Sequence, residues 1–163
     1  IPFRANGPSY TPMPQSLSNI LVHVVFSTKD RTPFFKPEMR AESHAYLATV
    51  VRGLGCECYR VGGIEDHVHL AVRLSRTIEV ADLIKGIKTP SSKWMKHRFP
   101  IDAAKFAWQR GYGAFSADPE SRERLLAYID NQVEHHRHVS FQDEYRDFLH
   151  RYEIPYDEQY VWD

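Results

Sequence analysis

The sequence predicts an α+β fold: a ferredoxin-like βαββαβ antiparallel sheet with helices on one face, plus a C-terminal helix that carries a tyrosine. Two observations support this class. Segments with the alternation or the β-branched content of strands recur along the chain, and segments with helical periodicity separate them in the order strand, helix, strand, strand, helix, strand. Such a sheet leaves its second face available to functional side chains.

The first half of the chain contains three predicted strands and one helix. Residues 17–27 are rich in β-branched residues and form the first strand. Residues 37–54 form the first helix, because Pro37 suits a first helical turn and two glycines lie near the exit. Residues 56–61 and 67–74 are the second and third strands, and the short glycine-containing link between them predicts a hairpin.

The middle of the chain contains the second helix and the fourth strand. Residues 78–98 show helical periodicity, and Pro90 should kink or divide this helix. Residues 106–109 and 112–116 offer the material for a further strand around two glycines.

The chain ends in two predicted helices. The third helix begins at the capping residue Asp118 and runs to about His136. A last helix is expected over 141–152. The length suits a single domain over 13–163, whereas residues 1–12 are rich in Pro and Gly and are expected to be a disordered arm or a leftover of cloning.

Composition excludes two classes of protein. The chain has 163 residues, and no apolar run approaches the length of a membrane span. The two cysteines, Cys56 and Cys58, lie two apart on one predicted strand, where disulfide geometry is rarely met. We therefore expect neither a membrane protein nor a disulfide-rich secreted one, but a protein of the cytoplasm.

Charge is distributed unevenly, although the formal net charge is zero. Residues 76–110 contain eight basic and three acidic residues, whereas residues 118–163 contain five basic and twelve acidic ones. A basic middle suggests a surface for a polyanion. The alternative is an ordinary solvated helix face.

His67-Val68-His69 is the most informative motif. Side chains alternate along a strand, so the two imidazoles point the same way, roughly 6–7 Å apart at Cα. The intervening apolar residues point into the core. Two imidazoles on the free face of a sheet are half of a metal site, but an isolated pair is weak evidence.

The third helix offers two further polar side chains. Tyr128 and Gln132 are four residues apart and so lie one above the other at the edge of the apolar stripe. His136 extends the same row by one turn. The alternative for Tyr128 is a packing role with its hydroxyl in water.

The chain resembles the small single-tyrosine HUH transposases of the insertion-sequence-200 type, in which HUH denotes His-hydrophobic-His. The resemblance runs from about Leu17 to the C-terminus, and four motifs in order support it. These motifs are Asp66-His67-Val68-His69, Lys85-Gly86-Ile87-Lys88, Trp108-Gln109-Arg110-Gly111-Tyr112 and Tyr128-Ile129-Asp130-Asn131-Gln132.

The resemblance implies a metal-assisted attack on DNA. It implies that His67, His69 and Gln132 bind a divalent cation, either Mg²⁺ or Mn²⁺, and that Tyr128 is the nucleophile. Attack on a phosphodiester would leave a 5′-phosphotyrosine and a free 3′-hydroxyl, without a nucleotide cofactor. It further implies single-stranded DNA hairpins at the element ends as substrate and a homodimer, acting at the bacterial nucleoid.

Other residues receive supporting roles. Candidate DNA contacts are Lys85, Lys88, Lys93, Arg110 and Tyr112. Trp108 could stack on a base or pack in the core. Asp66 could hydrogen-bond to a metal-binding imidazole and orient it, or it could cap a turn. His136 is a further candidate for a residue that orients a metal ligand without binding the metal.

Two other functions compete with this prediction. A histidine-triad nucleotide hydrolase would continue the alternation, but the next alternate position is Ala71. A non-catalytic or domesticated protein that binds single-stranded nucleic acid on the same fold remains the alternative.

Overall fold

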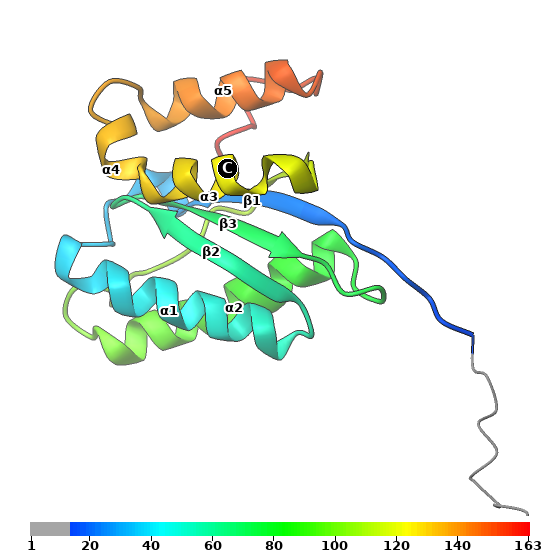
Figure 1. Cartoon of the computed structure of the whole chain (residues 1–163). Helices are drawn as coiled ribbons and strands as arrows, with labels where there is room; N and C mark the ends of the chain where they lie inside the picture. Colours follow the sequence, from blue (N-terminus) through cyan, green and yellow to red (C-terminus); the bar gives the residue numbers. More distant parts are fainter. Residues whose placement is uncertain (1–13) are drawn as a thin grey trace, which may run out of the picture.

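A four-stranded antiparallel sheet lies between two layers of helices (Figure 1). The computed structural model describes residues 14–163, so the expectation for residues 1–12 lies outside the described residues. The main elements are β1 (Leu21–Ser27), α1 (Pro37–Gly53), β2 (Glu57–Gly63), β3 (His67–Arg73), α2 (Val80–Arg98), β4 (Gly113–Ala117), α3 (Arg122–Asp130), α4 (Gln132–His135) and α5 (Phe141–Arg151). Short 3-10 turns occupy Lys29–Arg31 and Pro119–Ser121. Within the described part of the chain, every helix is too short or too polar to cross a membrane.

The strand order in the sheet is β2-β3-β1-β4, and each neighbouring pair is antiparallel. This confirms the predicted α+β class and the predicted succession of strands and helices. β1 and β3 occupy the two central positions, where Val25 pairs with His69 and Ser27 pairs with His67. The predicted histidine pair therefore lies in the middle of the sheet.

The main core lies on one face of the sheet, here called the first face. Val24 and Phe26 of β1 and Val68 and Leu70 of β3 point to this face and are fully buried. The helices α1 and α2 cover them, as the alternation of apolar residues predicts (Figure 1). Because strand side chains alternate, His67 and His69 must point to the opposite face, here called the second face.

The second face is covered, which differs from the expectation of an open face. The helices α3, α4 and α5 lie over it (Figure 1). The reason is the apolar stripe of α5, in which Phe141, Tyr145 and Phe148 recur at helical spacing. These side chains pack against Val25 and Phe115 of the sheet and form a second core.

Several predicted boundaries need correction. The helix expected over 118–136 is divided, because Asn131 leaves the helical region and separates α3 from α4. Asp130 and Asn131 are both weak helix formers. Pro90 lies inside α2 without dividing it. Residues 106–109 contribute only an isolated bridge between Trp108 and Thr28 in place of a strand.

A glycine allows α3 to approach the sheet. A Cβ built on Gly62 of β2 would clash with the backbone carbonyl oxygen of Ile129, which follows Tyr128. A backbone oxygen cannot move aside without shifting the helix that carries it, which costs stability. Gly62 therefore sets how closely the tyrosine helix lies to β3.

We expect Gly62→Ala to lower the free energy of unfolding by about 1–3 kcal/mol, because the added methyl group overpacks this contact. Gly53→Ala is the matched control, since a Cβ there meets nothing within 4 Å. At that helix end alanine should be neutral or stabilising by less than about 1 kcal/mol. Urea unfolding of both variants measures the difference, and equal stabilities would contradict the contact.

Candidate active site

The two imidazoles of β3 are completely buried on the second face. The Nδ1 of His67 donates to the carboxylate of Asp66 at 2.7 Å, because an ionised carboxylate can only accept. That hydrogen bond fixes the tautomer in which Nε2 of His67 carries a lone pair. The Phe141 ring stacks on the His67 ring at 4.4 Å between centroids and holds its orientation.

His69 is held from behind by a third histidine. Its Nδ1 lies 2.8 Å from Nε2 of His23, which projects from β1 on the same face. Burial lowers the pKa of His69 to about 4, and burial together with His69 lowers the pKa of His23 well below its usual range. Both rings are therefore neutral at pH 7, and one of them donates its N–H to the other. When His69 donates that N–H, its Nε2 is free to act as a ligand.

Gln132 lies beside the histidine pair, as the resemblance implied. It is 1% exposed, and its Oε1 lies 3.3 Å from Nε2 of His67. The same oxygen lies 3.0 Å from Nε2 of His136, which contributes to this cluster from the end of α4. The amide nitrogen of Gln132 donates to the Tyr128 carbonyl across the break between the helices.

Glu144 of α5 reaches the same point, and the sequence interpretation gave it no role. It is 3% exposed. Its Oε1 lies 3.0 Å from Nε2 of His69 and 3.7 Å from Nε2 of His67. Burial raises the pKa of Glu144, but hydrogen bonds, first among them that of His136, outweigh burial and hold it well below its usual range. An acid within the apolar stripe of α5 was the available signal.

Tyr128 joins the cluster through the second oxygen of that carboxylate. Its hydroxyl donates to Oε2 of Glu144 and lies 3.4 Å from Nε2 of His135. Burial and the charge of Glu144 raise the pKa of Tyr128, so the phenol is neutral at physiological pH. A neutral phenol that donates to a carboxylate has an acceptor in place for its proton.

The cluster has the composition of a metal site. One potential ligand atom from each of four residues lies within 4.8 Å of the others, these residues being His67, His69, His136 and Glu144. His69 Nε2 and Glu144 Oε1 are buried, and neither makes an aligned hydrogen bond despite their 3.0 Å separation. Buried polar atoms normally have partners, so this pair has the geometry of ligands that face a cation.

A cleft of about 720 Å³ leads from the surface to the tyrosine. The end of β4, α3 and α5 contribute to its wall, and Tyr128, His135 and Glu144 are among the residues that line it. Arg124 and Arg151 line it together with the acids Asp118 and Asp147, so its wall carries charges of both signs. Within this mixed lining, the two arginines are the groups that can pair with an anion near Tyr128.

The predicted DNA contacts lie elsewhere. Lys85, Lys88 and Lys93 belong to α2, which covers the first face, whereas the candidate site lies on the second (Figure 1). The exposed Arg110 and Tyr112 precede β4. Their roles in DNA binding stay predictions. Trp108 packs in the core and donates to Ser91 at 2.9 Å.

Lys88 has an internal set of partners. Its ammonium donates to the carbonyls of Gln109 at 2.8 Å and Gly111 at 2.7 Å, and lies 3.3 Å from that of Arg110. Burial lowers the pKa of Lys88 to about 8. Lys88 therefore anchors the segment that leads into β4.

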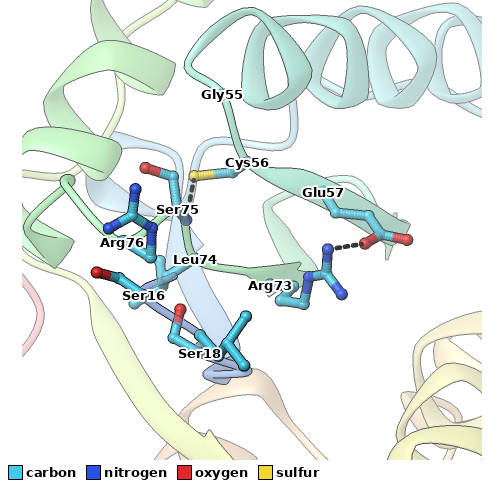
Figure 2. Close-up of a pocket in the computed structure, with 10 residues that line it drawn as sticks. Ser16, Ser18, Gly55, Cys56, Glu57, Arg73, Leu74, Ser75 and Arg76 are labelled. Carbon is cyan, nitrogen blue, oxygen red and sulfur yellow. Dashed lines mark hydrogen bonds and ion pairs between the residues drawn. The ribbon is translucent and has the colours of Figure 1, made fainter. Parts of the chain in front are cut away.

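A second pocket lies at the other end of β3 (Figure 2). Two pairs of its lining residues interact: the backbone N–H of Ser75 donates to Cys56 Sγ at 3.4 Å, and Arg73 contacts Glu57 at 3.1 Å (Figure 2). None of the predicted site residues lines it. It is not the candidate active site.

Comparison with known proteins adds independent findings. The family model described as "Transposase IS200 like" matches residues 16–132. A proposed transposase from Deinococcus radiodurans R1 is similar in structure, with 21% identity, a TM-score of 0.59, and coverage of 75% of this chain and 97% of that one. A REP-associated tyrosine transposase bound to a REP hairpin has 13% identity, a TM-score of 0.53, and coverage of 79% of this chain and 76% of that one. At these identities the structural likeness shows the fold alone. No curated protein sequence matches the chain.

We expect Lys88→Met to lower the free energy of unfolding by about 1.5–3 kcal/mol, because three carbonyls lose a charged donor. Lys85→Met is the control, since Lys85 is exposed on the same helix and should change stability by less than about 0.5 kcal/mol. Thermal unfolding of the two variants distinguishes them. A Lys88→Met protein as stable as the wild type would contradict this anchoring role.

Proposed function

Because the chain belongs to the family of IS200-like transposases, we propose that it is a single-strand DNA endonuclease and strand transferase. One observation carries the proposal. The hydroxyl of Tyr128 and the buried histidine pair of β3 contact the same carboxylate, that of Glu144. A potential nucleophile thus lies beside a potential metal site within one chain.

Tyr128 would be the nucleophile of this reaction. Its hydroxyl oxygen attacks the phosphorus of a phosphodiester, and the bond to the 3′-oxygen breaks. The products are a 5′-phosphotyrosine and a strand with a free 3′-hydroxyl. The phenol proton passes by way of Glu144 Oε2, the acceptor of its hydrogen bond, to the leaving 3′-oxygen, so that Glu144 is ionised before and after the step. One phosphodiester replaces another, so strand transfer needs no nucleotide cofactor.

His67, His69 and Gln132 would hold a divalent cation, Mg²⁺ or Mn²⁺. Two observations support this assignment. Nε2 of His69 is buried without a hydrogen-bond partner. The hydrogen bond from Nδ1 of His67 to Asp66 leaves a lone pair on Nε2 of His67. When bound, the cation would polarise the scissile phosphate and offset its charge in the transition state.

The substrate would be single-stranded DNA that carries a hairpin. The REP-associated transposase of similar fold is bound to such a hairpin. In this chain the cleft with Arg124 and Arg151 would admit the single strand, because its arginines can pair with phosphates. We also propose a homodimer that acts at the bacterial nucleoid, on family membership alone. The geometry does not call for a partner subunit, because Tyr128 lies beside the histidine pair of its own chain.

Tyr128→Phe should abolish formation of the covalent protein–DNA adduct. The assay incubates a pool of hairpin-bearing single strands with Mn²⁺ and detects the adduct by its altered migration in a denaturing gel. Tyr145→Phe, a neighbouring buried tyrosine, should form the adduct as the wild type does. An adduct with Tyr128→Phe would exclude Tyr128 as the nucleophile. A wild type that binds DNA without an adduct would favour the non-catalytic binding protein.

His67→Ala and Gln132→Ala should each reduce the metal-dependent cleavage rate by at least about 100-fold, because a ligand matters more than the supporting residues behind it. His97→Ala, an exposed histidine of α2, should leave the rate unchanged. Initial rates across a series of Mn²⁺ concentrations measure the effect. Full metal-dependent rates in the first two variants would refute the proposed ligands.

A further inference from the structure

We infer that Glu144, on the C-terminal helix α5, is a further ligand of the divalent cation, so that cation binding and docking of α5 are coupled. The inference rests on the proposed cation site of His67, His69 and Gln132 and adds a fourth residue to it. This residue lies outside the segment that matches the family model, which ends at Gln132.

The geometry of Oε1 supports a cation more than a hydrogen bond. This oxygen lies 3.0 Å from Nε2 of His69, but neither atom makes an aligned hydrogen bond. The same oxygen lies 3.7 Å from Nε2 of His67, the ring nitrogen that carries no proton when Nδ1 donates to Asp66. Two nitrogen lone pairs and a carboxylate oxygen that converge without a proton repel one another. A cation between them converts that repulsion into attraction.

The charge of the cluster supports the same assignment. Imidazoles and an amide are neutral ligands, so a buried cation bound only by them would keep both of its charges uncompensated. Glu144 is 3% exposed and supplies a negative charge. Within residues 14–163 its ion-pair partners are all histidines, without lysine or arginine. Carboxylate oxygen is also the ligand type that Mg²⁺ and Mn²⁺ prefer.

The second oxygen gives this ligand a positioning role. Oε2 accepts the hydrogen bond of Tyr128, while Oε1 faces the histidine pair. One rigid carboxylate thus sets the place of the hydroxyl relative to the cation. The N-cap of α5 helps to fix that carboxylate, because the Ser140 hydroxyl accepts from the backbone N–H of Asp143 at 3.1 Å.

The test measures Mn²⁺ binding in the absence of DNA. Glu144→Gln should weaken the Mn²⁺ affinity at least about 10-fold. Calorimetry and the electron paramagnetic resonance signal of free Mn²⁺ both measure this affinity. Glu153→Gln is the matched control, since it makes the same change of side chain at an exposed position just after α5 and should bind as the wild type does. An affinity of Glu144→Gln within twofold of the wild type would overturn the assignment.

Hydrogen exchange supplies a second readout that does not depend on activity. Mn²⁺ should slow amide exchange across α5 in the wild type, because binding stabilises the docked helix. In Glu144→Gln this slowing should disappear, even if the variant is less stable overall. Equal slowing in both proteins would overturn the coupling.

His67→Ala separates this inference from the proposed function. If His67→Ala loses Mn²⁺ binding while Glu144→Gln keeps it, only the Glu144 ligand is wrong, and protonated histidines balance its charge instead. If His67→Ala also keeps full affinity, the proposed cation site itself is wrong. The adduct assay with Tyr128→Phe tests the nucleophile independently of both results.

Discussion

The docking of α5 against the second face of the sheet is the interaction on which the candidate site depends. The apolar stripe of α5 covers the central strands and excludes water from the histidines. Phe141 stacks on His67, and Phe148 lies edge-on to His23 with 5.1 Å between centroids. Charges interact more strongly in such an environment than in water. The same docking that forms the second core therefore determines the strength of the electrostatics in the site.

Burial also determines the protonation states of the cluster. It favours neutral rings for His23 and His69 and a neutral phenol for Tyr128. Glu144 is the exception, since its hydrogen bonds keep it ionised despite burial. A neutral imidazole at His69 and an ionised carboxylate at Glu144 are the forms in which these two groups can bind a cation. Among residues 14–163, the ion-pair partners of Glu144 are histidines, and none is a lysine or an arginine.

The parts of the site that follow from local periodicity could be predicted from the sequence. Alternation in β3 predicted that His67 and His69 share a face, and the structure places both on the second face. The spacing of Tyr128 and Gln132 predicted neighbours on one helix, whereas the chain breaks at Asn131 and still brings both to the site. Local propensity at Asp130 and Asn131 was the missed signal.

The contribution of α5 could not be predicted in the same way. Its stripe indicates an amphipathic helix, but periodicity does not say which surface the helix covers. The βαββαβ order by itself places helices on one face of the sheet, so it predicts an open second face. Glu144 was missed for this reason, because an acid in an apolar stripe gains meaning only when the packed partner is known. Lys88 likewise looked like a surface cation until its three carbonyl partners were seen.

The boundary of the family match gives the site a modular character. The match ends at Gln132, whereas the helix that seals the site begins at Phe141. The strand histidines, the tyrosine and the glutamine thus belong to the shared region, and the cover belongs to a C-terminal appendage. Exchange of that appendage between relatives would alter the dielectric, the charge and the access of the reaction centre without any change in the shared scaffold. The environment of the candidate site in this chain therefore depends on a helix that lies outside the segment by which the family is recognised.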